Sequence, residues 1–233
     1  MINRKYRLIY ITSVVLCLSI AVPLSLMYII TPWIVVRFSQ TAYMAINEIC
    51  FWAMGIGVVI VVLFWERQSL LSIGFRRLTW KEGWLALSLG IFLFLLAPVL
   101  SIFMERVVGT STKMMDTVEA LAQFPIWLRI LLAARAGFVE EILYRGYPIE
   151  RLNRLTGRIW PGALISLVIF TVLHLLSWGL GHTICVVLPI GMILTGLYVW
   201  KRNLTLNITV HFLIDFLCLV LLPLLPPLFE SQK

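Results

Sequence analysis

The sequence is poor in charged residues. Only 13% of its 233 residues are Asp, Glu, Lys or Arg, while 61% are hydrophobic. Soluble domains contain about 25% charged and about 45–50% apolar residues, so the composition excludes an ordinary soluble domain. The mean hydropathy is +0.98, and apolar runs long enough to cross a bilayer recur from end to end. We therefore predict an all-α, polytopic helical membrane protein rather than a soluble domain with one anchor.

Cysteine is also scarce. The four cysteines lie inside apolar runs and form no Cys-x-x-Cys pair, which argues against a disulfide framework and against a zinc–cysteine site. The His-Glu-x-x-His motif of zinc proteases is absent as well. The cysteines are Cys17, Cys50, Cys185 and Cys218.

Seven hydrophobic segments can be drawn, which predicts about seven transmembrane helices. They cover residues 8–30, 43–64, 83–104, 127–150, 160–179, 183–200 and 203–225. With the N-terminus in the cytoplasm, most lysines and arginines fall in cytoplasmic loops, as the positive-inside rule requires. The net charge of +8 is then a consequence of topology, and we expect no nucleic acid partner.

The segments divide one integral membrane domain into two parts. Residues 1–125 are expected to form the N-terminal transmembrane helices and an outer amphipathic segment, because apolar residues recur with helical spacing in residues 110–127. Residues 126–225 are expected to form a helical core that carries the buried ionisable groups.

Three charges interrupt the fourth segment, in the stretch GFVEEILYRGY at residues 137–147. Glu141 and Arg145 are four residues apart, so they share one helix face and can pair. Glu140 points about 100° away from that face. A charge at the bilayer centre costs roughly 2.5–3.5 kcal/mol on insertion scales, so Glu140 requires a polar cavity or a partner on another helix.

Two other segments supply candidate partners. FTVLH places Phe170 and His174 four residues apart, and HFLID does the same for His211 and Asp215. At 1.5 Å per residue, Glu140, His174 and His211 lie roughly 16, 21 and 13 Å from the cytoplasmic edges of their helices. We therefore expect all three near the midplane of a bilayer core about 30 Å thick. Arg135, further towards the outer side, is expected to snorkel to the interface rather than bind a negative substrate group.

A carboxylate and two imidazoles away from bulk water are suited to hydrolysis. In one version, Glu140 and His174 activate a water molecule and His211 stabilises the oxyanion, with no cofactor. In the other, Glu140, His174 and His211 bind zinc, which activates the water. Each histidine alone, and the Glu141–Arg145 pair, can also be explained as a helix-packing contact.

The three motifs together, EEILYR, FTVLH and HFLID, resemble the CPBP family of intramembrane proteases, which includes type II CAAX prenyl endopeptidases and bacterial Abi or bacteriocin-immunity proteins. The resemblance covers about residues 130–220. It implies an endopeptidase with Glu140 and His174 activating water, and with His211 and residue 215 stabilising the oxyanion. It assigns Glu141, Arg145 and Phe170 supporting roles, and it leaves a glutamate-type and a metal-dependent mechanism open.

Residue 215 departs from the asparagine that is common in this family. An ionised Asp215 would repel an oxyanion, so we expect it to orient His211 and favour its imidazolium form instead. A protonated Asp215 is the alternative.

The predicted function is therefore hydrolysis of a peptide bond in a membrane-associated peptide or a lipidated protein tail. The alternatives are a non-catalytic membrane scaffold, such as a bacteriocin-immunity protein, and a transporter or proton relay. Membrane lipid and a peptide or protein tail are the expected partners. The small size and the lack of an organelle signal favour a bacterial plasma membrane.

Overall fold

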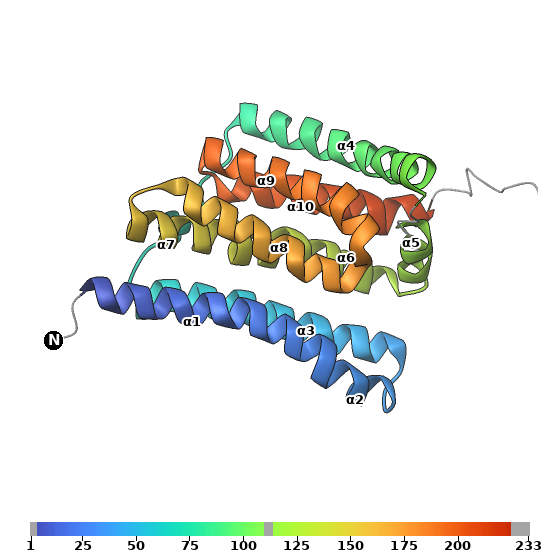
Figure 1. The fold of residues 1–233 in the computed structure, drawn as a ribbon, viewed down its shortest axis with the longest axis horizontal. Coiled ribbons are helices and arrows are strands. Elements are labelled where there is room, and N and C mark those ends of the chain that lie inside the picture. The colour runs from blue at the N-terminus through green and yellow to red at the C-terminus, as the bar shows by residue number, and fades with distance from the viewer. Residues whose placement is uncertain (1–3, 110–113, 225–233) are drawn as a thin grey trace, which may run out of the picture.

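The computed structural model describes residues 4–109 and 114–224, and every regular element in this part of the chain is a helix. Figure 1 shows long helices lying side by side in layers. The N-terminal layer contains α1 (Arg4–Ser25), α2 (Thr31–Val35) and α3 (Gln40–Ile60). The opposite layer contains α4 (Trp80–Phe103). The predicted all-α fold is confirmed.

The C-terminal half lies between these two layers (Figure 1). It contains α6 (Ile126–Arg135), α7 (Tyr147–Thr156), α8 (Ile159–His182), α9 (Leu188–Lys201) and α10 (Leu204–Phe216). The short helix α5 (Met114–Ala122) covers one end of the bundle. Residues 110–113 of the predicted amphipathic segment lie outside the described residues.

Five helical stretches in the described part of the chain are long and apolar enough to cross a membrane. They are Tyr6–Val35, Gln40–Trp65, Trp80–Val107, Ile159–Lys201 and Leu204–Leu224. The fourth, of 43 residues, contains a break at Gly179 with φ 77°, and it comprises two of the predicted segments. The predicted segment 127–150 is not among the five, because it contains six charged residues: Arg129, Arg135, Glu140, Glu141, Arg145 and Glu150.

Helix ends follow local sequence signals. Thr79 and Glu82 form a capping box at the start of α4, and the Asn203 side chain accepts a hydrogen bond from the Leu206 amide at the start of α10. Gly157, with φ 72°, ends α7 in the left-handed conformation that glycine adopts without strain. These signals allow α7 and α8 to pack as antiparallel neighbours.

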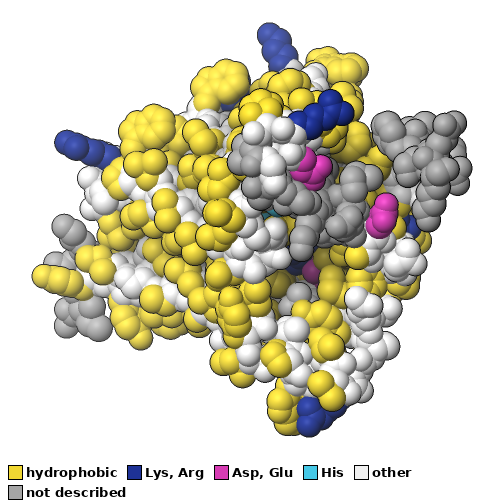
Figure 2. All heavy atoms as spheres, turned by 45° about the vertical axis from the view of Figure 1, so that its right-hand side comes forward, with side chains coloured by type: hydrophobic (Ala, Val, Ile, Leu, Met, Phe, Trp, Pro, Cys, Tyr) yellow, Lys and Arg dark blue, Asp and Glu magenta, His cyan; other side chains and the backbone are white. Residues whose placement is uncertain are grey.

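The distribution of polarity is inverted relative to a soluble protein. Large apolar side chains such as Phe92, Leu164 and Val168 are exposed, and Figure 2 shows a surface dominated by hydrophobic side chains. Glu141, Arg145 and Asn207 are instead fully buried. Exposed apolar and buried charged groups fit a protein whose solvent is lipid, and the chain is an integral membrane protein.

Candidate active site

The helix that carries the two glutamates is wound irregularly. Between α6 and α7 it contains two π-helical turns, η5 (Ala136–Glu140) and η6 (Ile142–Gly146), with Glu141 between them. Such turns occur frequently at functional sites. Gly137 allows α10 to approach closely, because a Cβ there would lie 2.8 Å from the Phe212 Cβ and 3.0 Å from the Ile208 carbonyl oxygen. The irregular turns thus bring both glutamates against α10.

Glu140 is 7% exposed and has two neighbours. Its Oε1 accepts a hydrogen bond from Nη1 of Arg135 at 2.5 Å. Its Oε2 lies 3.8 Å from Nε2 of His174. The buried charge of Glu140 therefore has a partner on another helix, His174 of α8. Its second partner is Arg135, five residues earlier on the helix that carries Glu140.

Arg135 does not snorkel to the interface, so that expectation was wrong. Its Nε donates a hydrogen bond to Oε1 of Glu48 at 3.0 Å, and its Nη1 is bound to Glu140. The guanidinium also lies 4.9 Å from the centre of the Phe51 ring. Two carboxylates hold the guanidinium inside the protein because they compensate its charge there.

Glu141 is completely buried and occupies the centre of a second network. Its Oε1 accepts hydrogen bonds from Nη1 of Arg145 at 2.9 Å and from Nδ1 of His211 at 2.8 Å. Its Oε2 accepts one from Nδ2 of Asn207 at 3.2 Å. The Glu141–Arg145 pair therefore forms as its spacing predicts, and it also orients His211.

His174 has a defined orientation. Its Nδ1 lies 2.8 Å from the carbonyl oxygen of Phe170, which can only accept, so Nδ1 carries the proton in this contact. In the neutral ring Nε2 is then an acceptor, and this is the atom that faces Glu140. The Phe170 ring lies against the imidazole with centroids 4.2 Å apart, and the Arg145 guanidinium lies 4.1 Å from the centre of the same ring.

Asp215 reaches His211 less closely than its spacing allows. Its Oδ2 lies 3.9 Å from Nε2 of His211, which is beyond hydrogen-bond distance. Nδ1 of the ring instead donates its hydrogen bond to Glu141. The expectation that Asp215 orients His211 is therefore corrected: Asp215 faces the free nitrogen, and Glu141 orients the ring.

One cavity of about 970 Å³ is lined by Glu140, His174, His211 and Asp215. Helices from both halves of the chain form its wall, including α3, α5, α8 and α10. Figure 2 shows a hollow among hydrophobic side chains in which histidine, acidic and basic side chains are visible. Its ionisable lining residues are Glu48, Arg135, Glu140, His174, His182, His211 and Asp215, with Cys218 and Tyr144.

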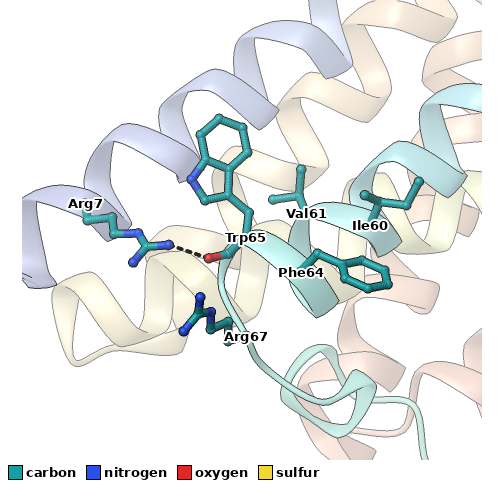
Figure 3. Close-up of a pocket in the computed structure, with 6 residues that line it drawn as sticks. All are labelled: Arg7, Ile60, Val61, Phe64, Trp65 and Arg67. Carbon is teal, nitrogen blue, oxygen red and sulfur yellow. Dashed lines mark hydrogen bonds between the residues drawn. The ribbon is translucent and has the colours of Figure 1, made fainter.

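A second hollow, of about 380 Å³, lies beside the start of α1 and the end of α3. Figure 3 shows Arg7 and Arg67 in it, with Arg7 donating to the Trp65 carbonyl oxygen at 2.6 Å. It has no acidic or histidine side chain in its lining, so it offers no group for acid–base chemistry.

The donor groups do not fit the alternative zinc site as they stand. In the described part of the chain, no three His, Cys, Asp or Glu side chains are grouped as metal ligands. Oε1 of Glu140 is already bound to a guanidinium, whose charge would oppose a divalent cation at that carboxylate.

The two hydrogen-bond networks include residues outside the motifs, namely Glu48, Arg135 and Asn207. Glu48 had the same signal as Glu140, namely a carboxylate within an apolar segment, and this signal marks a functional position in a membrane helix. The pairing of Glu48 with Arg135 joins residues 87 positions apart, so no local spacing indicates it.

Fold and site together define a polytopic helical membrane protein with a buried glutamate and histidine centre. A family model described as type II CAAX prenyl endopeptidase Rce1-like matches residues 122–217. This stretch contains all three motifs, and the match confirms the predicted resemblance to the CPBP family. At the level of the family, it supports a CAAX-type intramembrane protease. No curated protein and no solved structure matches the chain.

Proposed function

We propose that the protein is an intramembrane endopeptidase in which Glu140 and His174 activate a water molecule. One observation carries the proposal: Oε2 of Glu140 and Nε2 of His174 face each other on the wall of a cavity and lie 3.8 Å apart. Both atoms are acceptors, and a water molecule can donate one hydrogen to each. A water held in this way presents its oxygen lone pair to a substrate carbonyl.

In the reaction, the water oxygen forms a bond to the carbonyl carbon and its proton passes to Glu140. The carbonyl π electrons move to the oxygen, which becomes an oxyanion. Collapse of this intermediate breaks the carbon–nitrogen bond, and the leaving amine takes the proton from Glu140. Positioned acid–base groups of this kind contribute about 10²–10⁴-fold to rate.

His211 is the group suited to stabilise the oxyanion. Its Nδ1 donates to Glu141 and its ring lines the cavity, where Nε2 donates to a substrate oxygen when the ring is protonated. Arg145 shares the same Glu141 oxygen and keeps the carboxylate in place. A preorganised donor aimed at the developing charge is the usual means of lowering such a barrier.

We infer the substrate class from the apolar wall of the cavity and from the family description. The cavity has a largely apolar wall, so it suits a peptide that lies in the membrane or a protein tail that carries a lipid. The family description names CAAX prenyl substrates, and we propose a lipidated or hydrophobic peptide tail for this chain. A bacterial plasma membrane and a cytoplasmic N-terminus are part of the same proposal.

The test uses purified protein in liposomes with a quenched fluorescent peptide that ends in a prenylated CAAX sequence, beside its unprenylated twin. Glu140→Gln and His174→Ala are each expected to lower kcat by about 10²–10⁴-fold. Glu119→Gln, on the exposed face of α5, is the matched control and should cleave as the wild type does. Equal cleavage by Glu140→Gln and wild type contradicts the proposal and favours a non-catalytic scaffold.

A chelator separates the two mechanisms. The glutamate-type mechanism predicts unchanged cleavage after prolonged dialysis against the chelator. Loss of cleavage that returns on addition of zinc would assign the reaction to a metal-dependent mechanism.

A further inference from the structure

Arg135 joins two carboxylates that come from different halves of the chain. Its Nε is bound to Glu48 on α3 and its Nη1 to Glu140, at 3.0 and 2.5 Å. The two carboxylates accept hydrogen bonds from different nitrogens of one planar guanidinium, so the guanidinium fixes their positions relative to each other.

Glu48 lies outside the part of the chain that the family model matches. It is 1% exposed, its Oε2 has no hydrogen-bond partner among the described residues, and its neighbours along α3 are largely apolar. A buried ion pair is commonly no more stable than an apolar pair of similar volume. Helix packing alone therefore gives no reason for a carboxylate here.

The surroundings of Arg135 hold it in one place. Phe51, one turn after Glu48, sets its ring 4.9 Å from the guanidinium. Gly55, one turn further, allows α3 to pack on Val139, to which a Cβ at position 55 would lie only 3.0 Å away. α3 thus contacts the π-helical turn that carries Glu140, and it contributes the group that anchors Arg135.

We propose that Glu48 and Arg135 are positioning residues for the catalytic carboxylate. Glu48 holds the guanidinium, and the guanidinium binds Oε1 of Glu140. This leaves Oε2 turned towards His174. The inference rests on the proposed function, and it makes the N-terminal helices part of the active site.

The geometry also predicts that Glu48 acts through Arg135, since Oε1 of Glu48 binds Nε of Arg135 and Nη1 of the same guanidinium binds Glu140. Removing the Glu48 carboxylate leaves Nε of Arg135 without its partner. The Arg135 side chain is 17% exposed and lines the cavity, so the guanidinium can then move. The carboxylate of Glu140 is then no longer held in one orientation.

The test compares Glu48→Gln, Arg135→Gln and the double variant in the peptide assay. Small displacements of catalytic groups cost up to about 10²-fold, so each single variant should lower kcat by about 10- to 100-fold with KM unchanged within about twofold. The double variant should equal Arg135→Gln within about twofold, because the second change then removes nothing further. Glu48→Asp and Arg135→Lys are made in parallel. They keep the charge at each position and replace any glutamine variant that does not fold.

Glu66→Gln is the matched control, since Glu66 is also a buried carboxylate paired with an arginine. Its Oε2 accepts from Nε of Arg151 at 2.8 Å, away from the cavity. This change should lower the unfolding temperature and leave kcat unchanged. Wild-type kcat in folded Glu48→Gln, a loss proportional to unfolded protein, or additive effects in the double variant would overturn the inference.

Glu140→Gln in the same series separates the two claims. If Glu140→Gln is inactive while folded Glu48→Gln and Arg135→Gln cleave normally, only the positioning role fails. If Glu140→Gln itself cleaves as wild type, the proposed function fails and the positioning role fails with it.

Discussion

Asp215 is the motif residue whose role the structure changes most. Its spacing from His211 predicts a direct contact, yet the ring donates its hydrogen bond to Glu141 at 2.8 Å, while Asp215 lies 3.9 Å from the other ring nitrogen. The ring orientation is therefore set by the buried network of Glu141, Arg145 and Asn207. Asp215 stands beside the nitrogen that faces the cavity.

Asp215→Asn should retain substantial activity. The amide removes a negative charge next to the expected oxyanion, and His211 keeps its hydrogen bond to Glu141. We expect a loss smaller than the roughly 10²-fold that removal of an oxyanion donor causes. Cleavage of the prenylated peptide measures it, and near-complete loss would show that the Asp215 carboxylate has a role of its own.

Glu141→Gln should damage both folding and activity. It removes the charge that compensates Arg145 at a site with no exposure, and an unpaired buried charge costs about 3–5 kcal/mol. The free energy of unfolding in mixed detergent measures the loss. Glu119→Gln on the exposed face of α5 should show none, and equal stability of the two variants would be evidence against a structural pair.

The helix from Ile126 to Thr156 positions the site through its two π-helical turns and its close packing on α10. Gly137 is a point of close approach, because a Cβ there would lie 3.0 Å from the Ile208 carbonyl oxygen and from the Phe212 backbone nitrogen. The position of Glu140 therefore depends on a glycine three residues earlier.

Gly137→Ala should lower activity and stability together. The added Cβ would lie 2.8 Å from Phe212 and 3.0 Å from backbone, and overpacking of this kind costs about 1–3 kcal/mol. Gly57→Ala is the matched control, because an added Cβ there meets nothing within 4 Å. Thermal unfolding and kcat are measured for both, and equal behaviour would contradict the close-packing account.

Local sequence patterns predict most of the helices, but they do not predict where the helices depart from regular α-helical geometry. The apolar runs and the Glu141–Arg145 spacing gave the right elements and the right pair. The run of 43 residues with its break at Gly179 was also drawn as two segments. The π-helical turns were not predictable, because they depend on how α10 and the helix with the glutamates pack, and no local spacing encodes that contact.

The motif residues of the candidate site can be named from the sequence, but the contacts that join the two parts of the chain cannot. Glu140, His174, His211 and Asp215 lie on one cavity. No local pattern pairs Glu48 with Arg135, since their contact exists only after α3 has packed against α6. The division into residues 1–125 and 126–225 therefore does not separate a scaffold from a complete site.

The topology of the whole molecule gives a further prediction. With seven crossings and a cytoplasmic N-terminus, a reporter fused after residue 233 should lie outside the cell, and one inserted between α7 and α8 should lie inside. Paired fluorescent and phosphatase fusions measure both positions. A cytoplasmic C-terminus would show that one of the segments does not cross the membrane.

The most direct test of the account is single-turnover cleavage in ¹⁸O-labelled water by wild-type protein and by Glu140→Gln, both shown to be folded. The account predicts that the wild type releases a new carboxyl group carrying one ¹⁸O atom, and that Glu140→Gln forms this product at least about 10²-fold more slowly. Labelled product formed at the same rate by both proteins would contradict it.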